Sequence, residues 1–149
     1  MTNTRIELSF NRIARLSDAG DFAELLFPGN RNQQHCFLAI WFSIKWADHG
    51  LVPNLQDVAA KHRVSRRTLE RVRAKLRRLG LLDHVCRFNK QFGYREGWTL
   101  SARFSRSLAQ FAQVSSKLLV REGSSAEKDE FMVRMWEARA AAPNESTSR

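Results

Sequence analysis

Hydrophobic residues recur mostly at helical spacing, and short alternating stretches are few. Residues 6–10 alternate apolar and polar side chains, which predicts a short strand with one buried face. A helix with Ser17 as its N-cap is expected to run to Leu26, where Pro28-Gly29 follows and ends it. The next helix, residues 30–48, is apolar on most sides, so we expect it at the centre of the core or shared with a second subunit.

The middle of the chain predicts two helices joined by a tight turn. Gly50 to Pro53 interrupt the helical pattern and leave residues 51–52 as a strand of one or two residues. A short helix is expected over residues 55–62 and a longer one over residues 65–79. Gly80 is expected to cap the longer helix at its C-terminus.

A hairpin and two further helices are expected after Gly80. Residues 82–88 and 98–102 have the pattern of strands, and the glycines of the loop 89–97 suit a β-hairpin. A long amphipathic helix then follows from Phe104, and a capping box formed by Ser124 and Glu127 opens the last helix. These elements predict a mainly α fold with a small β-hairpin.

Composition indicates a folded protein without catalytic chemistry. An apolar fraction of 43% with 10 Phe and 4 Trp is typical of a globular domain. No apolar stretch reaches the roughly 20 residues of a membrane span, and no secretion signal is evident, so we expect a cytoplasmic protein. Cys36 and Cys86 are expected to be reduced and partly buried. We expect no metal, no cofactor and no enzymatic activity, because no phosphate loop, ligand cluster or nucleophile–base set can be identified.

The net charge of +10 is concentrated in the middle of the chain. The net charge is −1 over residues 1–60, +8 over residues 61–78, +3 over residues 79–106 and zero from residue 107 to the end. Like charges gathered in one segment repel each other, and a polyanionic partner would offset that repulsion. The charge pattern therefore favours a nucleic-acid partner.

The segment from Asn54 to Val85, NLQDVAAKHRVSRRTLERVRAKLRRLGLLDHV, resembles the DNA-binding core of bacterial and archaeal winged helix-turn-helix regulators. The matching residues are Leu55, Ala59 or Ala60, Val64-Ser65, Thr68-Leu69 followed by Arg71, and Leu79-Gly80-Leu81-Leu82. The resemblance covers about a third of the chain. One departure is Arg63, which stands at a turn position that is commonly glycine in these families. A left-handed arginine costs ~1 kcal/mol, so we expect a turn slightly different from the usual one.

The resemblance implies a recognition helix that begins at Ser65 and enters the major groove of DNA. An apolar stripe is expected to be buried, formed by Leu69, Val72, Leu76 and Leu79. Ser65 would cap the helix and leave its N-terminus facing a phosphate. Base contacts are expected from Arg66, Arg67 and Glu70, and phosphate contacts from Arg71, Arg73 and Lys75. Some of these residues have an alternative to a contact with DNA. Glu70 can instead pair with Arg66 or Arg73 on the same helix, and Arg77 and Arg78 can simply complement the helix dipole.

The hairpin loop interleaves basic and aromatic residues, as expected of a wing that grips the DNA backbone or minor groove. One of Phe92 and Tyr94 is expected to fold back on the core. The complete set of expected DNA-binding residues is Ser65, Arg66, Arg67, Thr68, Glu70, Arg71, Arg73, Lys75, Arg87, Lys90, Tyr94 and Arg95.

The domain organisation follows from these elements. We expect a strand and helix over residues 1–30, the winged helix-turn-helix over 31–103, C-terminal helices over 104–142 that dimerise or close the core, and a disordered tail over 143–149. The leading hypothesis is a sequence-specific binder of double-stranded DNA, a homodimeric transcriptional regulator. The alternatives are a plasmid or phage replication-initiator or partition protein, an RNA-binding protein, and a protein-interaction module in a larger assembly. The sequence identifies no small-molecule effector.

Overall fold

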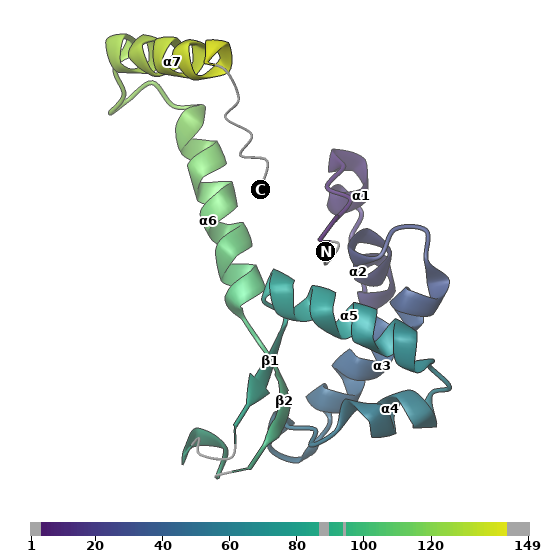
Figure 1. The fold of residues 1–149 in the computed structure, drawn as a ribbon. Coiled ribbons are helices and arrows are strands. Elements are labelled where there is room, and N and C mark those ends of the chain that lie inside the picture. The colour runs from purple at the N-terminus through teal and green to yellow at the C-terminus, as the bar shows by residue number, and fades with distance from the viewer. Residues whose placement is uncertain (1–3, 87–89, 94, 143–149) are drawn as a thin grey trace. The chain divides into compact units, whose positions relative to one another are not determined.

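A computed structural model describes residues 4–86, 90–93 and 95–142. The chain divides into two compact units, residues 1–106 and 107–149. Among the described residues the fold is mainly helical with a two-stranded antiparallel sheet (Figure 1), which confirms the expected class at that level.

The first unit holds most of the elements. In chain order they are α1 (Phe10–Ala14), α2 (Ala19–Leu26), α3 (Arg31–Lys45), the 3-10 turn η1 (Asp48–Gly50), α4 (Leu55–Lys61), α5 (Arg66–Leu79), β1 (Leu82–Val85), the 3-10 turn η2 (Lys90–Phe92) and β2 (Gly97–Leu100). Helix α6 (Arg103–Leu118) begins in this unit, and α7 (Ala126–Ala141) belongs to the second.

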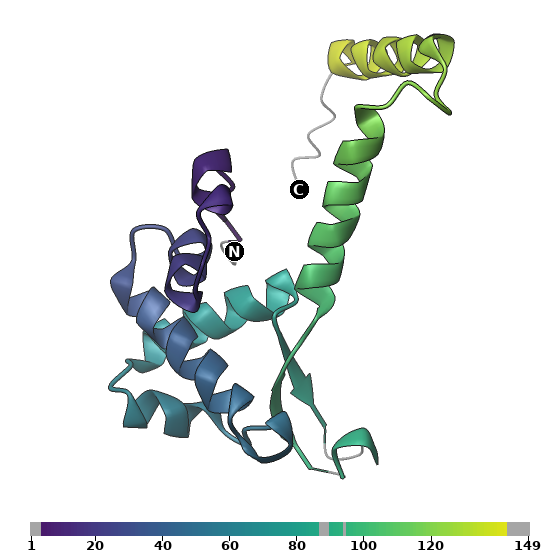
Figure 2. The same cartoon turned by 180° about the vertical axis from the view of Figure 1, so that it is seen from behind.

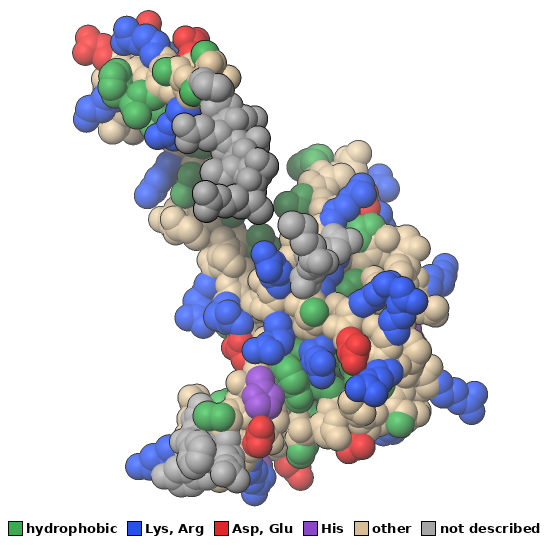
Figure 3. Space-filling view, viewed as in Figure 1, with side chains coloured by type: hydrophobic (Ala, Val, Ile, Leu, Met, Phe, Trp, Pro, Cys, Tyr) green, Lys and Arg blue, Asp and Glu red, His purple; other side chains and the backbone are tan. Residues whose placement is uncertain are grey.

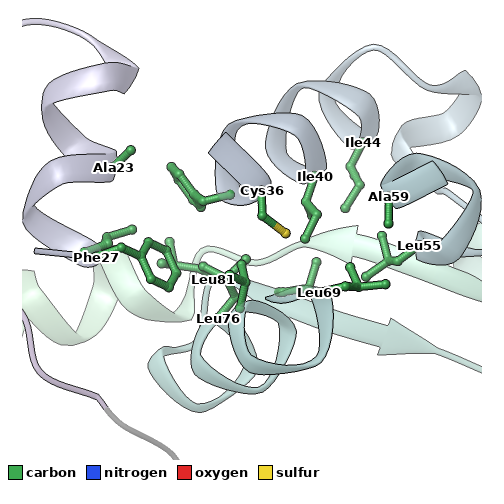
Figure 4. Packing of buried hydrophobic residues seen from close by; sticks show 14 of the residues in the cluster. Ala23, Phe27, Cys36, Ile40, Ile44, Leu55, Ala59, Leu69, Leu76 and Leu81 are labelled. Atoms are coloured by element: carbon green, nitrogen blue, oxygen red, sulfur yellow. The ribbon is translucent and has the colours of Figure 1, made fainter. Parts of the chain in front are cut away.

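Helix α3 is the centre of the first unit. It contacts α2, α4, α5 and β2. It lies behind α5 in Figure 1 and in front of α5 in Figure 2, which shows the same cartoon from behind. Its buried side chains include Phe37, Ile40 and Ile44, and they belong to one cluster with residues of α2, α4 and α5 (Figure 4). Each such aliphatic or aromatic side chain contributes about 1.5–3 kcal/mol when fully buried. The expected position of this helix in the core is confirmed.

The apolar stripe of α5 is buried as predicted. Leu69, Val72 and Leu76 are almost inaccessible to solvent, and Leu79 packs against the same cluster. The stripe fixes how α5 is rotated about its own axis, because the side chains that are not in the stripe must face elsewhere.

The turn before α5 keeps a left-handed residue in spite of its sequence. Arg63 has φ of +58°, and Val64 then donates a backbone hydrogen bond to the Ala59 carbonyl at 2.8 Å. The expectation that the turn differs slightly from the usual one stays a prediction. The left-handed backbone is retained at Arg63, at a cost of about 1 kcal/mol.

A third chain segment extends the two-stranded sheet by one residue. In the β1–β2 register Leu82 faces Leu100 and Val85 faces Gly97. Val52 and Trp98 exchange backbone hydrogen bonds of 3.0 and 2.8 Å, which confirms the predicted short strand at residues 51–52.

Three local predictions are wrong. Residues 6–10 form no strand, because the Glu7 amide donates to the Leu25 carbonyl at 3.0 Å instead of pairing with a strand. Asp18 caps α2, and Ser17 donates its hydroxyl to Asp21. Ser124 forms no capping box. It donates its hydroxyl to the Arg121 carbonyl at 2.8 Å, and α7 begins after Ser125, which makes no side-chain cap.

The two cysteines differ in environment. Cys36 is buried in the core, where burial raises the pKa of its thiol to about 12. Cys86 is exposed, and both are free thiols. No helix in the part of the chain that the structure describes has the length and apolar character needed to cross a membrane.

Lys75 does not reach outward, which corrects its expected role as a phosphate contact. Lys75 is only 5% exposed. The ammonium donates hydrogen bonds to the carbonyl of Arg5, at 2.7 Å, and to that of Leu26. It also lies 4.7 Å from the centre of the Phe27 ring. Desolvation lowers the pKa of this lysine. The two hydrogen bonds join the N-terminal segment and the end of α2 to α5.

Replacing Lys75 by methionine is therefore expected to destabilise the protein. Lys75→Met keeps the buried stem but leaves two backbone carbonyls without a donor, and we expect the free energy of unfolding to fall by about 1–3 kcal/mol in urea titrations followed by circular dichroism. Arg78→Met, on the exposed side of the same helix, should change it by less than about 0.5 kcal/mol. If Lys75→Met were as stable as the wild type but lost affinity for nucleic acid, Lys75 would be a phosphate contact as the sequence predicted.

Gly97 is required where Val52 joins the sheet. A Cβ added at this position would lie 2.6 Å from the Val52 carbonyl oxygen, which is closer than atoms approach in real structures. We expect Gly97→Ala to lower the free energy of unfolding by about 1–3 kcal/mol, because the backbones must move apart. A variant with unchanged stability in the same urea titration would show that Val52 does not pair with β2.

Candidate nucleic-acid interface

The outer face of α5 carries a dense array of arginines. Arg66, Arg67, Arg71, Arg77 and Arg78 are exposed and Arg73 is half-buried, whereas Glu70 is the one acidic residue of the helix. Figure 3 shows Lys and Arg side chains gathered over the region that α5 occupies in Figure 1. Burial of the apolar stripe on one side of the helix explains why these cations share the other side.

The N-terminus of α5 is capped from within. The Ser65 hydroxyl accepts a hydrogen bond from the Thr68 amide at 3.2 Å and lies 2.9 Å from the Thr68 hydroxyl. The expected N-cap is thus confirmed. Arg63 and Ser65 also line a small polar depression at this end of the helix, together with Asn32 and His35 of α3. Ser65 and Thr68 lie at the end of the helix where its dipole is positive.

Glu70 is paired with Arg66, one of the two alternatives that the sequence left open. Arg66 Nε lies 3.2 Å from Glu70 Oε1, and the two side chains are 79% and 51% exposed. An exposed pair of this spacing contributes only about 0.2–0.5 kcal/mol, so it opens readily for another partner. Among the described residues, Arg67 and Arg71 form no salt bridge, and both are exposed.

Trp98 connects α5 to the hairpin. The guanidinium carbons of Arg73 and Arg77 both lie 5.5 Å from the centre of the Trp98 ring. On the hairpin, His84 meets the same ring edge-on at 4.8 Å and lies 3.5 Å from Glu96. Each cation–π contact of this kind contributes about 0.5–1 kcal/mol. The contacts hold Arg73 and Arg77 beside the sheet, so they form the border between the helix and the hairpin.

The sequence did not identify this role of Trp98. A tryptophan at the start of a strand has no local pattern that reveals two arginines contacting it from a helix about 20 residues earlier. The alternative that Arg77 only complements the helix dipole is incomplete, because Arg77 contacts Trp98. Arg78 is exposed in the last turn of α5, where it can complement the dipole.

The hairpin contributes two further exposed cations, Lys90 and Arg95. Phe92 is half-buried, but it does not belong to the residues that pack against the core cluster, so it does not fold back on the core as one of the two loop aromatics was expected to do. Arg87 and Tyr94 lie outside the residues that the structure describes. Basic side chains of α5 and of the hairpin thus belong to neighbouring elements, because α5 contacts β1 and Trp98 links α5 to β2.

A mostly apolar groove lies between α3 and α4. It is lined by Leu38 and Phe42 of α3, by Val58 of α4, and by Trp46 and His62, the residues that follow these two helices. Trp46 is 80% exposed. Among the described residues, no three His, Cys, Asp or Glu side chains are grouped as metal ligands.

Comparison with known proteins leaves the chain without a family assignment. No protein-family model matches it, and neither the search of curated proteins nor that of solved structures found a match.

Proposed function

We propose that this protein is a winged helix-turn-helix protein that binds double-stranded DNA in a sequence-specific manner and regulates transcription. Helix α4, the turn at Arg63 and helix α5 would form the helix-turn-helix, and the β1–β2 hairpin would be the wing. The order of these elements supports the proposal, as does the pairing of Val52 with Trp98, which supplies the extra strand of such folds.

The observation that carries the proposal is the one-sided cationic face of α5. Six arginines share this helix with a single glutamate, and their side chains are exposed or half-buried. Releasing the counterions of DNA phosphates gives such a surface a large favourable free energy at low salt. An α-helix also has the diameter that the major groove admits.

The contacts within α5 divide the arginines into groups with different expected roles. Arg67 and Arg71 are free to reach a ligand, and Arg67, in the first turn, is the base reader that we favour. Arg66 and Glu70 hold each other until DNA competes for them, after which Arg66 can contact guanine and Glu70 a cytosine amino group. Arg71 contacts a phosphate.

The remaining cations would bind the DNA backbone at the edge of the interface. Arg73, whose guanidinium lies beside the Trp98 ring, would contact a phosphate of the DNA strand that passes between α5 and the wing. Lys90 and Arg95 would extend this contact along the wing, to the backbone or the minor groove. Lys75 is excluded from the interface because its ammonium is bonded to backbone carbonyls of the protein.

The roles of Arg67 and Arg71 can be separated by their dependence on DNA sequence. A preferred site is first selected from a random duplex pool, and binding is then measured by fluorescence anisotropy. Arg67→Ala should weaken binding to this site by ~1–3 kcal/mol and relax the preference at one base pair. Arg71→Ala should weaken binding to all duplexes alike and reduce the slope of log K against log salt by about one.

Arg15→Ala is the matched control, because Arg15 is an exposed arginine at the end of α1 and lies outside the charged segment. It should leave the preferred site and the affinity for it nearly unchanged. If Arg67→Ala and Arg71→Ala both bound the selected duplex as tightly as the wild type, α5 would not be the recognition helix. Selective binding to single-stranded or hairpin RNA would instead favour an RNA-binding role.

A further inference from the structure

The second unit exposes a large number of apolar side chains to solvent. The large apolar side chains that are more than a third exposed are Leu108, Phe111, Val114, Leu118, Leu119, Val120, Phe131, Met132, Val133, Met135 and Trp136. Within its described residues, 107–142, no residue is buried. A monomer rarely leaves such a set without a partner.

This surface is large enough for a stable protein–protein interface. Without Val133, which lies on another side of α7, the exposed fractions of these side chains correspond to roughly 1,000 Å² of accessible surface. A standard interface buries about 800 Å² on each partner. The partner must therefore offer a comparably large apolar surface.

Electrostatics favours a second copy of this chain as that partner. The basic and acidic residues from position 107 to the end balance, whereas residues 1–106 carry the whole net charge of +10. Two copies can meet through a neutral unit without repulsion, but they cannot meet through the cationic face of α5. A neutral surface also gives no attraction to a strongly acidic partner.

The position of the apolar cluster in α7 matches a two-fold axis. The helix runs from Ala126 to Ala141, and its apolar cluster from Phe131 to Trp136 lies at its midpoint. Phe131 with Met135 and Met132 with Trp136 are separated by four residues, so all four share one side of the helix. In an antiparallel pair the midpoints coincide, and each cluster then covers the other.

We propose that the second unit is a dimerisation unit in which α7 pairs with α7 of a second copy in antiparallel orientation about a two-fold axis, with the apolar side chains of α6 extending the contact. The biological role of this dimer rests on the proposed function. A dimer presents two copies of α5 to one duplex and recognises a site with two-fold symmetry.

The association itself is tested on the full chain without DNA. Sedimentation equilibrium should give twice the chain mass of 17.2 kDa for the wild type and the single mass for Phe131→Glu. Val133→Glu is the matched control, because Val133 and Phe131 are both 58% exposed but lie on different sides of α7. This control should remain dimeric. A monomeric wild type, or loss of the dimer in both variants, would overturn the proposal.

The orientation is tested by spin labels, which also guards against a Phe131→Glu chain that fails to fold. In a Cys86→Ser background, labels are placed on Arg134→Cys or on Ala141→Cys. Because the rise is 1.5 Å per residue, an antiparallel pair separates the two labels along the helix axis by roughly 2 Å near the midpoint and roughly 22 Å at the end. Double electron–electron resonance should therefore give a short distance between the two labels at position 134 and a much longer one between the two labels at position 141. Equal distances at the two positions would overturn the arrangement.

The dimer and the DNA-binding function fail in distinguishable ways. A monomer that still binds duplex DNA through α5 would refute the dimer alone. A dimer with the expected label distances that binds no duplex would refute the DNA-binding function alone.

Discussion

The fold of the first unit depends on the burial of one narrow apolar stripe of α5 against the central helix α3. Leu69, Val72 and Leu76 are almost inaccessible, and Phe37 and Ile40 belong to the same core. This contact does more than stabilise the unit, because it fixes the rotation of α5. Every arginine of the helix is consequently kept on the side away from α3, so the packing of the core creates the cationic surface.

Repulsion within that surface is limited by a few specific contacts. Glu70 neutralises Arg66, while Trp98 provides a ring face for Arg73 and Arg77. Lys75 is withdrawn from the surface altogether and joins the N-terminal segment and the end of α2 to α5. Arg67 and Arg71 retain no such partner among the described residues, and their charges are the ones most available to a ligand.

Periodicity predicted what is local in this chain and missed what depends on distant segments. The stripe of α5, its cap at Ser65 and the left-handed Gly80 follow from neighbouring residues, and all are present. The burial of Lys75 could have been suspected, since it shares the side of the helix on which Val72 and Leu79 lie. Its partners, however, are carbonyls of Arg5 and Leu26, which no local pattern identifies. The contacts of Trp98 were missed for the same reason, and the alternating segment 6–10 lacked a strand to pair with.

The central claim is that the arginine face of α5 binds duplex DNA. It is tested most directly by the anisotropy of a labelled duplex titrated with the wild-type protein over a series of salt concentrations. If several arginines contact phosphates, log K should fall linearly with log salt, with a slope of about −0.9 for each phosphate neutralised. Absence of duplex binding at low salt would contradict the account and leave the cationic face to a different partner.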